Sequence, residues 1–453
     1  MTKNEFRTGE PRAQRTVRGI IKSKHLKVHN MAQTLLSNQL FCAICLFATS
    51  FSGALECRDR FLEPFSSDSI WNTAIGSDAV FQHAHLFEEG DYRGLPTNFH
   101  NDQDFIIRSS ETDPLTAWIN QGDWGRDDHC TIQHGKNFGK TCGSDSEQTD
   151  TCTTHIRFPA KWTSASDCDG PPTSKGDNCR SAANQANNNA MAVLLPDNET
   201  LLQMQPVYRC GFYPSPLLAR WGNKTDGGPQ RFDNLTSIFG KGTGGAHGGS
   251  GLSSLGGSIR LGELLPGSPP INHALKIELA NWWYYGEKQL QPKTIDNQGR
   301  SQYLWPATGS NAGFNPETGK SNGNYVGKNP YVAPGALLAI PKALEKQVEV
   351  KTTIGKKIKD AFINYGGYIV DGTGPGSDGH NMVAICMDSL INAEMRHQYK
   401  FNMAYPHGVT DGNPVYSDLL KIFRNLHAVS NNSPSSVGGG GVPLKPTKPP
   451  LCK

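Results

Sequence analysis

The sequence lacks an internal repeat and a heptad run, so it is neither a solenoid nor a coiled coil. The sequence also lacks a large excess of either positive or negative charge. The chain has 44 Lys and Arg against 41 Asp and Glu, and residues 1–30 alone hold eight basic and two acidic side chains. Without that segment the chain is slightly acidic and has no interleaved basic and aromatic residues. Nothing in the composition therefore favours a nucleic-acid partner.

Phosphate-binding and serine-nucleophile motifs are missing as well. Residues 240–257 contain nine glycines, but no Lys–Ser/Thr pair closes them as in a P-loop, and no strand–helix–strand pattern surrounds them. Residues 248–252 end in leucine where the GxSxG motif needs glycine. A nucleotide enzyme is disfavoured, and a serine hydrolase is the least favoured hypothesis.

A hydrophobic run long enough for a transmembrane helix is not evident either. The apolar run at residues 40–51 is too short to span a bilayer comfortably, and three small residues follow it. This pattern predicts a signal peptide at 31–54, with residues 1–30 as an upstream basic extension. We therefore expect a secreted, extracellular protein with no membrane partner after cleavage. The alternative is a signal anchor that leaves the basic segment in the cytoplasm.

Cysteine usage agrees with export. Of eleven cysteines nine lie outside the predicted signal peptide; they form no CxxC pair, and their spacings fit no zinc pattern. Five of them fall in the polar segment 126–182, which predicts a disulfide-stapled insertion. The odd count leaves one thiol, for which Cys452 is the expected residue. Four sequons predict glycosylation, at Asn198, Asn223, Asn234 and Asn431.

Short apolar segments separated by 49 glycines and 29 prolines favour a mainly-β fold. We expect a single large domain at 55–435, resembling a β-sandwich or jelly roll with a few flanking helices, and a disordered tail at 436–453. The patterns predict two strands within 190–205, strands at 274–280 and 348–350, and helices at 353–365 and 417–426.

The glycine-rich segment and the strands after it carry the candidate site. Glycine costs conformational entropy on folding and is used where the backbone needs positive φ or a close approach to other atoms. Residues 240–257 are therefore expected to form an ordered loop with a defined conformation rather than a linker. A carboxyl pair is the minimum equipment of a glycoside hydrolase, whereas a polysaccharide lyase needs a base beside a charge-neutralising group. The predicted catalytic residues, which suit either scheme, are Glu263, His273 and Asp371.

Substrate binding is predicted around this set. Trp282 and Trp283 belong to a run of four aromatics that cannot all face one side of a strand, so some are expected to be exposed and to stack on sugar rings. The predicted substrate-binding residues are His247, Arg260, Trp282, Trp283 and Trp305. A purely structural role is the alternative for several of these residues. His247 and His273 would then be hydrogen-bonded loop or strand residues. Glu263 would form an ion pair with Arg260, and Asp371 would be a turn residue.

No cofactor is predicted. His247 and His273 have no short-spaced partner of a kind that binds zinc, so no metal site is predicted from them. Residues 371–381 offer oxygen ligands, which leaves calcium open.

The order of several motifs resembles that of a broad group of secreted β-rich proteins of bacteria and eukaryotes. The pattern is SxWN, then an acidic residue and PG, then IxHAL, WPA and YGxxxxD. The resemblance covers most of 60–435 and implies a secreted protein that acts on or binds glycans. The sequence also departs from the pattern of the group: Gln203 or Gln205 stands where a Glu is expected, and Thr-Gly-Ser follows WPA in place of a His. The recurrent positions are Trp71, Asn72, Glu263, His273, Trp305 and Asp371.

These observations lead to two functional hypotheses. The first is an enzyme that cleaves an extracellular polysaccharide, as a hydrolase or a lyase. The second is a non-catalytic protein of an extracellular matrix or coat, or a glycan-binding protein. The departures from the group favour an altered or inactive member.

Overall fold

The computed structural model describes residues 57–88, 95–120, 153–163, 190–209, 211–219, 236–285, 303–310, 314–315, 320–321, 325, 327–373, 382–404 and 408–452. The chain divides into two units, Met1–Glu56 and Cys57–Lys453, and the described residues all lie in the second. The expected signal peptide and most of the expected cysteine-rich insertion lie outside the described residues. No described helix has both the length and the apolar character needed to cross a membrane.

The mainly-β class is confirmed, and the larger sheet is mixed. Parallel pairs join β10 to β14, β15 to β2 and β2 to β5, which a purely antiparallel sandwich lacks. Its order is β1 (Phe81–His83), β17 (His427–Val429), β13 (Leu337–Ala339), β14 (Gly367–Thr373), β10 (Leu275–Ala280), β15 (Met382–Asp388), β2 (Asn98–Arg108), β5 (Met191–Leu194), β6 (Thr200–Met204) and β9 (Thr236–Ser237), with β16 (Val409–Thr410) on β2. A smaller sheet runs β4 (Thr153–Arg157), β3 (Leu115–Asn120), β8 (Leu217–Ala219) and β7 (Val207–Tyr208), and β11 (Phe314–Asn315) pairs with β12 (Lys320–Ser321).

Two of the described helices, α3 (Thr353–Asn364) and α5 (Pro414–Arg424), begin at side-chain caps. Thr352 accepts a hydrogen bond from the N–H of Gly355 before α3, and Asn413 caps α5, which has proline at its first position. Both predicted helices are confirmed. The remaining helical elements are α4 (Ile391–Tyr399), η1 (Asn281–Trp283), η2 (Lys342–Leu344) and η3 (Val437–Gly439).

The expected strand at 348–350 is wrong, because the backbone after it bonds to a side chain instead of a neighbouring strand. The N–H groups of Lys351 and Thr352 donate to the carboxylate of Asp418 on α5. The predicted strands within 190–205 and at 274–280 are confirmed as β5, β6 and β10.

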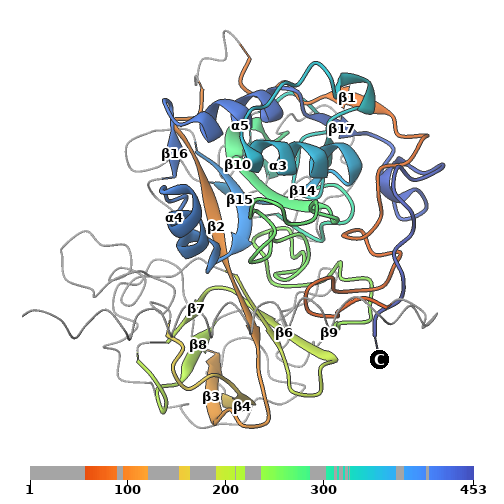
Figure 1. Ribbon diagram of the computed structural model, residues 1–453. Helices are drawn as coiled ribbons and strands as arrows, with labels where there is room; N and C mark the ends of the chain where they lie inside the picture. The colour runs from red at the N-terminus through yellow and green to blue at the C-terminus, as the bar shows by residue number, and fades with distance from the viewer. Residues whose placement is uncertain are drawn as a thin grey trace, which may run out of the picture. The chain divides into compact units, whose positions relative to one another are not determined.

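Side-chain alternation in β10 divides the larger sheet into two faces. Leu275, Ile277 and Leu279 join the core formed with α3 and α5, which Figure 1 shows side by side near β10 and β14. The intervening Lys276 and Glu278 therefore point to the opposite face. They are buried there, so on β10 the second face carries charge, beside an apolar cluster that includes Tyr368 and Val370 of β14.

The C-terminal segment is hydrogen-bonded to the start of the described unit. The N–H of Leu444 donates to Ile75, and Cys452 forms a disulfide with Cys57. Cys452 is therefore not the odd thiol that we expected; the free cysteine among the described residues is Cys386, which is buried. The tail beyond 436, expected to be disordered, is tied down by these bonds.

Removing the Cys57–Cys452 disulfide is expected to lower the free energy of unfolding by about 2–4 kcal/mol, because the bond closes a very long loop. Cys57→Ala, Cys452→Ala and the double variant should lose the same amount, since each breaks the same bond. Guanidinium unfolding curves measure this. A double variant that loses the sum of the two single effects would contradict the prediction.

Candidate functional site

Four neighbouring strands of the larger sheet bring polar side chains together on the face opposite α3 and α5. Asp371 comes from β14 and Cys386 from β15, on either side of β10. β10 contributes two residues and β2 another two. Together with one histidine from the glycine-rich loop, they form what we call the His247 centre: Asp102, Asp104, His247, Lys276, Glu278, Asp371 and Cys386.

The glycine-rich loop places His247 against this face. The N–H of His247 donates to Leu252, and that of Gly245 donates to Gly251, so the loop folds back on itself. Gly248 has φ +55°, and a Cβ there would come within 2.2 Å of the Asp371 carboxyl carbon. The expectation of an ordered loop is thus met by a close approach that only glycine permits.

Gln203 and Gln205 hold the same loop. The amide oxygen of Gln203 accepts from the hydroxyl of Ser253 (2.9 Å), and its nitrogen donates to the carbonyl of Gly244 (3.1 Å). Gln205 accepts from the N–H of Gly248. A glutamate at 203 would lose the donor to Gly244, so the amide is suited to positioning the loop.

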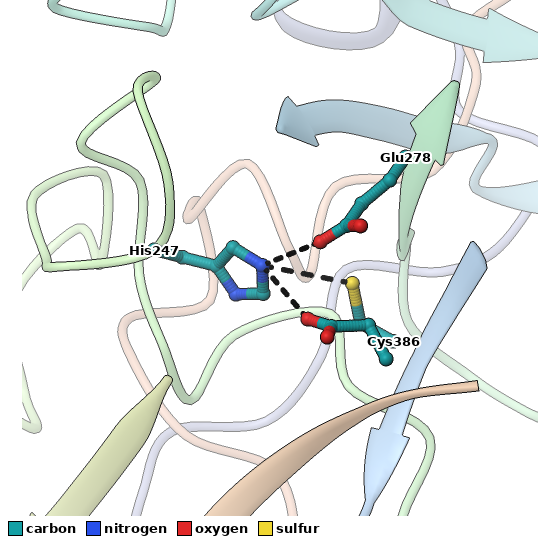
Figure 2. Close-up of side chains that lie close together, drawn as sticks. His247, Glu278 and Cys386 are labelled. Carbon is teal, nitrogen blue, oxygen red and sulfur yellow. Dashed lines mark hydrogen bonds and ion pairs between the residues drawn. The ribbon is translucent and has the colours of Figure 1, made fainter. Parts of the chain in front are cut away.

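Nε2 of His247 faces three acceptor-type atoms. It lies 3.1 Å from Glu278 Oε1, 3.3 Å from Asp102 Oδ2 and 3.9 Å from Cys386 Sγ. Figure 2 shows the ring nitrogen directed toward Glu278 and Cys386. The four donor atoms all lie within 4.8 Å of one another, which makes this a place where a metal ion could be held.

Lys276 lies against the other side of the ring and forms an ion pair with Asp104. Its Nζ lies 3.0 Å from His247 Nδ1 and 3.1 Å from Asp104 Oδ2, and it donates to the carbonyls of Ser253 and Ser254. The side chains of Lys276, Asp104 and His247 are fully buried. Those of Asp102 and Glu278 are 17% and 10% exposed, so these two carboxylates are the members nearest to solvent.

Burial and charge shift the pKa values within the centre in opposite directions. Burial raises the pKa of Glu278 well above its usual value, and the charge of Asp102 raises it further. Burial acts in the same sense on Asp102, but contacts with His247 outweigh it and lower its pKa. Burial and Lys276 act to lower the pKa of His247, yet its anionic neighbours hold it well above the usual value. Burial also raises the pKa values of Asp371 and of the Cys386 thiol.

Of the residues predicted from sequence, His247 and Asp371 meet in this centre, whereas Glu263 and His273 form a separate pair. Glu263 Oε2 lies 3.2 Å from His273 Nε2 and accepts from the N–H of Arg260 (2.6 Å). Burial acts to raise the pKa of Glu263, but His273 and these hydrogen bonds outweigh it and lower that pKa. The Arg260 guanidinium donates to the carbonyls of Ser258 and Leu255, so it supports the end of the glycine-rich loop.

The aromatic run is buried, and the expected exposure of part of it is wrong. Trp282 and Trp283 are 7% and 8% exposed, and Tyr284 and Tyr285 are buried as well. The Tyr284 hydroxyl donates to the backbone carbonyl of Asp371, so the run packs inward instead of offering a stacking face. Trp305 is half-buried against the core on the His247 side of the sheet.

Two positions of the resemblance also support the loop region. The indole of Trp71 donates to the carbonyl of Gly242 (2.6 Å), and its ring packs edge-on against Tyr368. The amide of Asn72 donates to the carbonyls of Pro64 and Ser66. Of the sequons, Asn198 and Asn431 are described, and both side-chain amides donate to backbone carbonyls; Asn223 and Asn234 lie outside the described residues.

A second group of side chains that could hold a metal ion lies on the surface. His83, His85 and Glu88 cluster at the end of β1, and His85 Nδ1 lies 2.6 Å from Glu88 Oε1. The ring of His427 on β17 packs against His83. These side chains are more exposed than those of the His247 centre.

Comparison of the chain with family models, with curated proteins and with solved structures found no match in any of the three. The function is therefore inferred from the geometry of the His247 centre.

Replacing Gly248 by alanine is expected to destabilise the protein by about 1–3 kcal/mol, through the left-handed backbone and the overlap with Asp371. Gly267 is the matched control: its φ is +78°, but a Cβ there meets nothing within 4 Å. Thermal and urea unfolding of the two alanine variants separates backbone strain from overlap. Equal losses in both would show that the approach to Asp371 carries no cost.

Proposed function

We propose that the protein is a secreted enzyme that cleaves an extracellular polysaccharide and that the His247 centre is where cleavage takes place. The observation that carries this proposal is the gathering of carboxylates from neighbouring strands beneath the glycine-rich loop. A buried cluster of charges is costly to maintain and is typical of functional sites.

Glu278 and Asp371 are the pair that we assign to cleavage. They are register partners on the parallel strands β10 and β14. Side chains at paired register positions on neighbouring strands lie side by side, and retaining glycosidases bring their two carboxyl groups within about 5–5.5 Å of each other. One carboxyl would protonate the leaving oxygen while the other attacks the anomeric carbon, so we expect retention of configuration.

Other features of the protein support a polysaccharide as the substrate. The expected signal peptide, the disulfide and the resemblance to secreted β-rich proteins support an extracellular polymer. The second hypothesis, a non-catalytic matrix or glycan-binding protein, is favoured by one observation: the aromatic run and most of the His247 centre are buried.

A polysaccharide panel tests the proposal. The full-length chain, secreted from a eukaryotic host, is incubated with neutral, uronic and sulfated polysaccharides, and new reducing ends and unsaturated-uronate absorbance are followed. Reducing ends without absorbance are expected for the hydrolase proposed above. Both signals together would assign a lyase, and silence from folded protein that still binds a polysaccharide would assign the non-catalytic function.

A further inference from the structure

One ring nitrogen in the His247 centre lies close to more hydrogen-bond acceptors than its single proton can satisfy. His247 Nε2 lies within 3.3 Å of oxygens from both Glu278 and Asp102. A single N–H can point at only one of them, and the contact of buried Asp102 Oδ2 with this nitrogen is an ion pair that lacks hydrogen-bond geometry. A metal cation at the middle of the group would contact every one of these atoms.

We propose that the His247 centre binds one divalent cation of the zinc class. Bond lengths of about 2.0–2.2 Å to nitrogen and oxygen and about 2.3 Å to sulfur place two ligands of a tetrahedral zinc ion about 3.3–3.6 Å apart. The distances from His247 Nε2, namely 3.1, 3.3 and 3.9 Å, bracket these values. The ligand atoms are His247 Nε2, Asp102 Oδ2, Glu278 Oε1 and Cys386 Sγ.

The surroundings of the histidine suit this role. The three N–H groups of Lys276 have three oxygen acceptors, on Asp104, Ser253 and Ser254, and so need no lone pair of the ring. Nδ1 of His247 can then carry a hydrogen toward Asp104 Oδ1, 3.3 Å away, leaving Nε2 for the metal. A carboxylate on the far nitrogen of a ligating histidine is the usual support for such a ligand.

The donor set also selects the metal. Imidazole and sulfur are ligands of zinc and other late transition metals, whereas calcium and magnesium require oxygen. Ligation further gives a reason for Cys386 to persist as a buried free thiol in a chain with a disulfide. A substrate oxygen that displaces Glu278 from the ion would free that carboxyl for the proposed cleavage; only this last step rests on the proposed function.

Cobalt substitution of the full-length protein tests the inference without any substrate. The chain is freed of metal by a chelator, loaded with Co²⁺ and examined by absorption spectroscopy, and zinc is titrated by calorimetry. We expect one equivalent bound, tetrahedral d–d bands and a near-ultraviolet thiolate-to-cobalt band. Cys386→Ser should lose the thiolate band, and Asp104→Asn should weaken zinc binding by about 10- to 100-fold.

His85→Ala is the matched control, because it removes a ligand from the surface histidine cluster and not from the His247 centre. This variant should keep the thiolate-to-cobalt band and should still bind one equivalent of zinc tightly. No thiolate band in the cobalt-loaded wild type, or a metal site lost in His85→Ala and kept in Cys386→Ser, would overturn the inference. Bound zinc without polysaccharide cleavage would instead remove the proposed function and leave the metal site standing.

Discussion

Glu278→Gln is expected to abolish polysaccharide cleavage while the protein stays folded. Glutamine keeps the size of the side chain but can neither donate an acidic proton nor act as a base, and such groups contribute about 100- to 10,000-fold to rate. Because the Glu278 carboxyl is buried and lies against His247, the isosteric amide preserves the packing. The measurement is the initial rate of reducing-end release on the polysaccharide that the panel identifies.

Glu263→Gln distinguishes the structural assignment from the sequence-based one. Glu263 bonds to His273 and to the Arg260 N–H, away from the carboxyl pair of β10 and β14, so this variant should retain cleavage. Glu345→Gln, at an exposed ion pair with Lys342, controls for a generic effect of losing charge. Full activity of Glu278→Gln together with an inactive Glu263→Gln would restore the sequence-based centre.

The sequence located the loop and one strand residue of the site but not the residues between them. Nine glycines around His247 identified a loop that approaches other atoms closely, and Asp371 follows the apolar residues Ile369 and Val370. Lys276 and Glu278 carried a usable signal: they alternate with leucine and isoleucine in β10, which places both on one face. Alternation gives the face of a strand but not its neighbours in the sheet.

Sheet order is what the sequence could not supply. β10 is flanked by β14 and β15, and β15 is followed by β2, which is far away along the chain. Asp102 and Asp104 therefore meet His247 through a parallel pairing that no local pattern encodes. For the same reason the spacing rules for zinc found nothing, because they detect ligands that lie close together in sequence.

The aromatic run illustrates a different failure. Alternation argued that four adjacent aromatics could not all face one side of a strand, but β10 ends at Ala280 and the tryptophans lie on the short helical turn η1. A 3₁₀ turn rotates successive side chains by about 120° instead of the roughly 180° of a strand, so two adjacent rings can both reach the core. The exposure of the tryptophans was predicted wrongly because the strand was assumed to continue past Ala280.

Lys276→Met is expected to be the most destabilising single substitution in the His247 centre, at about 3–5 kcal/mol. Methionine fills a similar volume but leaves the fully buried Asp104 without its ion partner and removes the donor to two buried carbonyls. Lys342→Met at the exposed pair with Glu345 should cost less than about 1 kcal/mol. Chemical unfolding curves of both variants give the comparison.

The double variant Lys276→Met/Asp104→Leu tells whether the loss comes from an unpaired charge or from packing. If the charge is responsible, removing Asp104 as well should recover part of the stability lost in Lys276→Met, because a buried pair replaced by apolar side chains is often close to neutral. Recovery will be incomplete, since the hydroxyl of Ser258 also donates to Asp104 (2.5 Å). Additive losses in the double variant would mean that the two side chains contribute independently and that their 3.1 Å contact does not stabilise the fold.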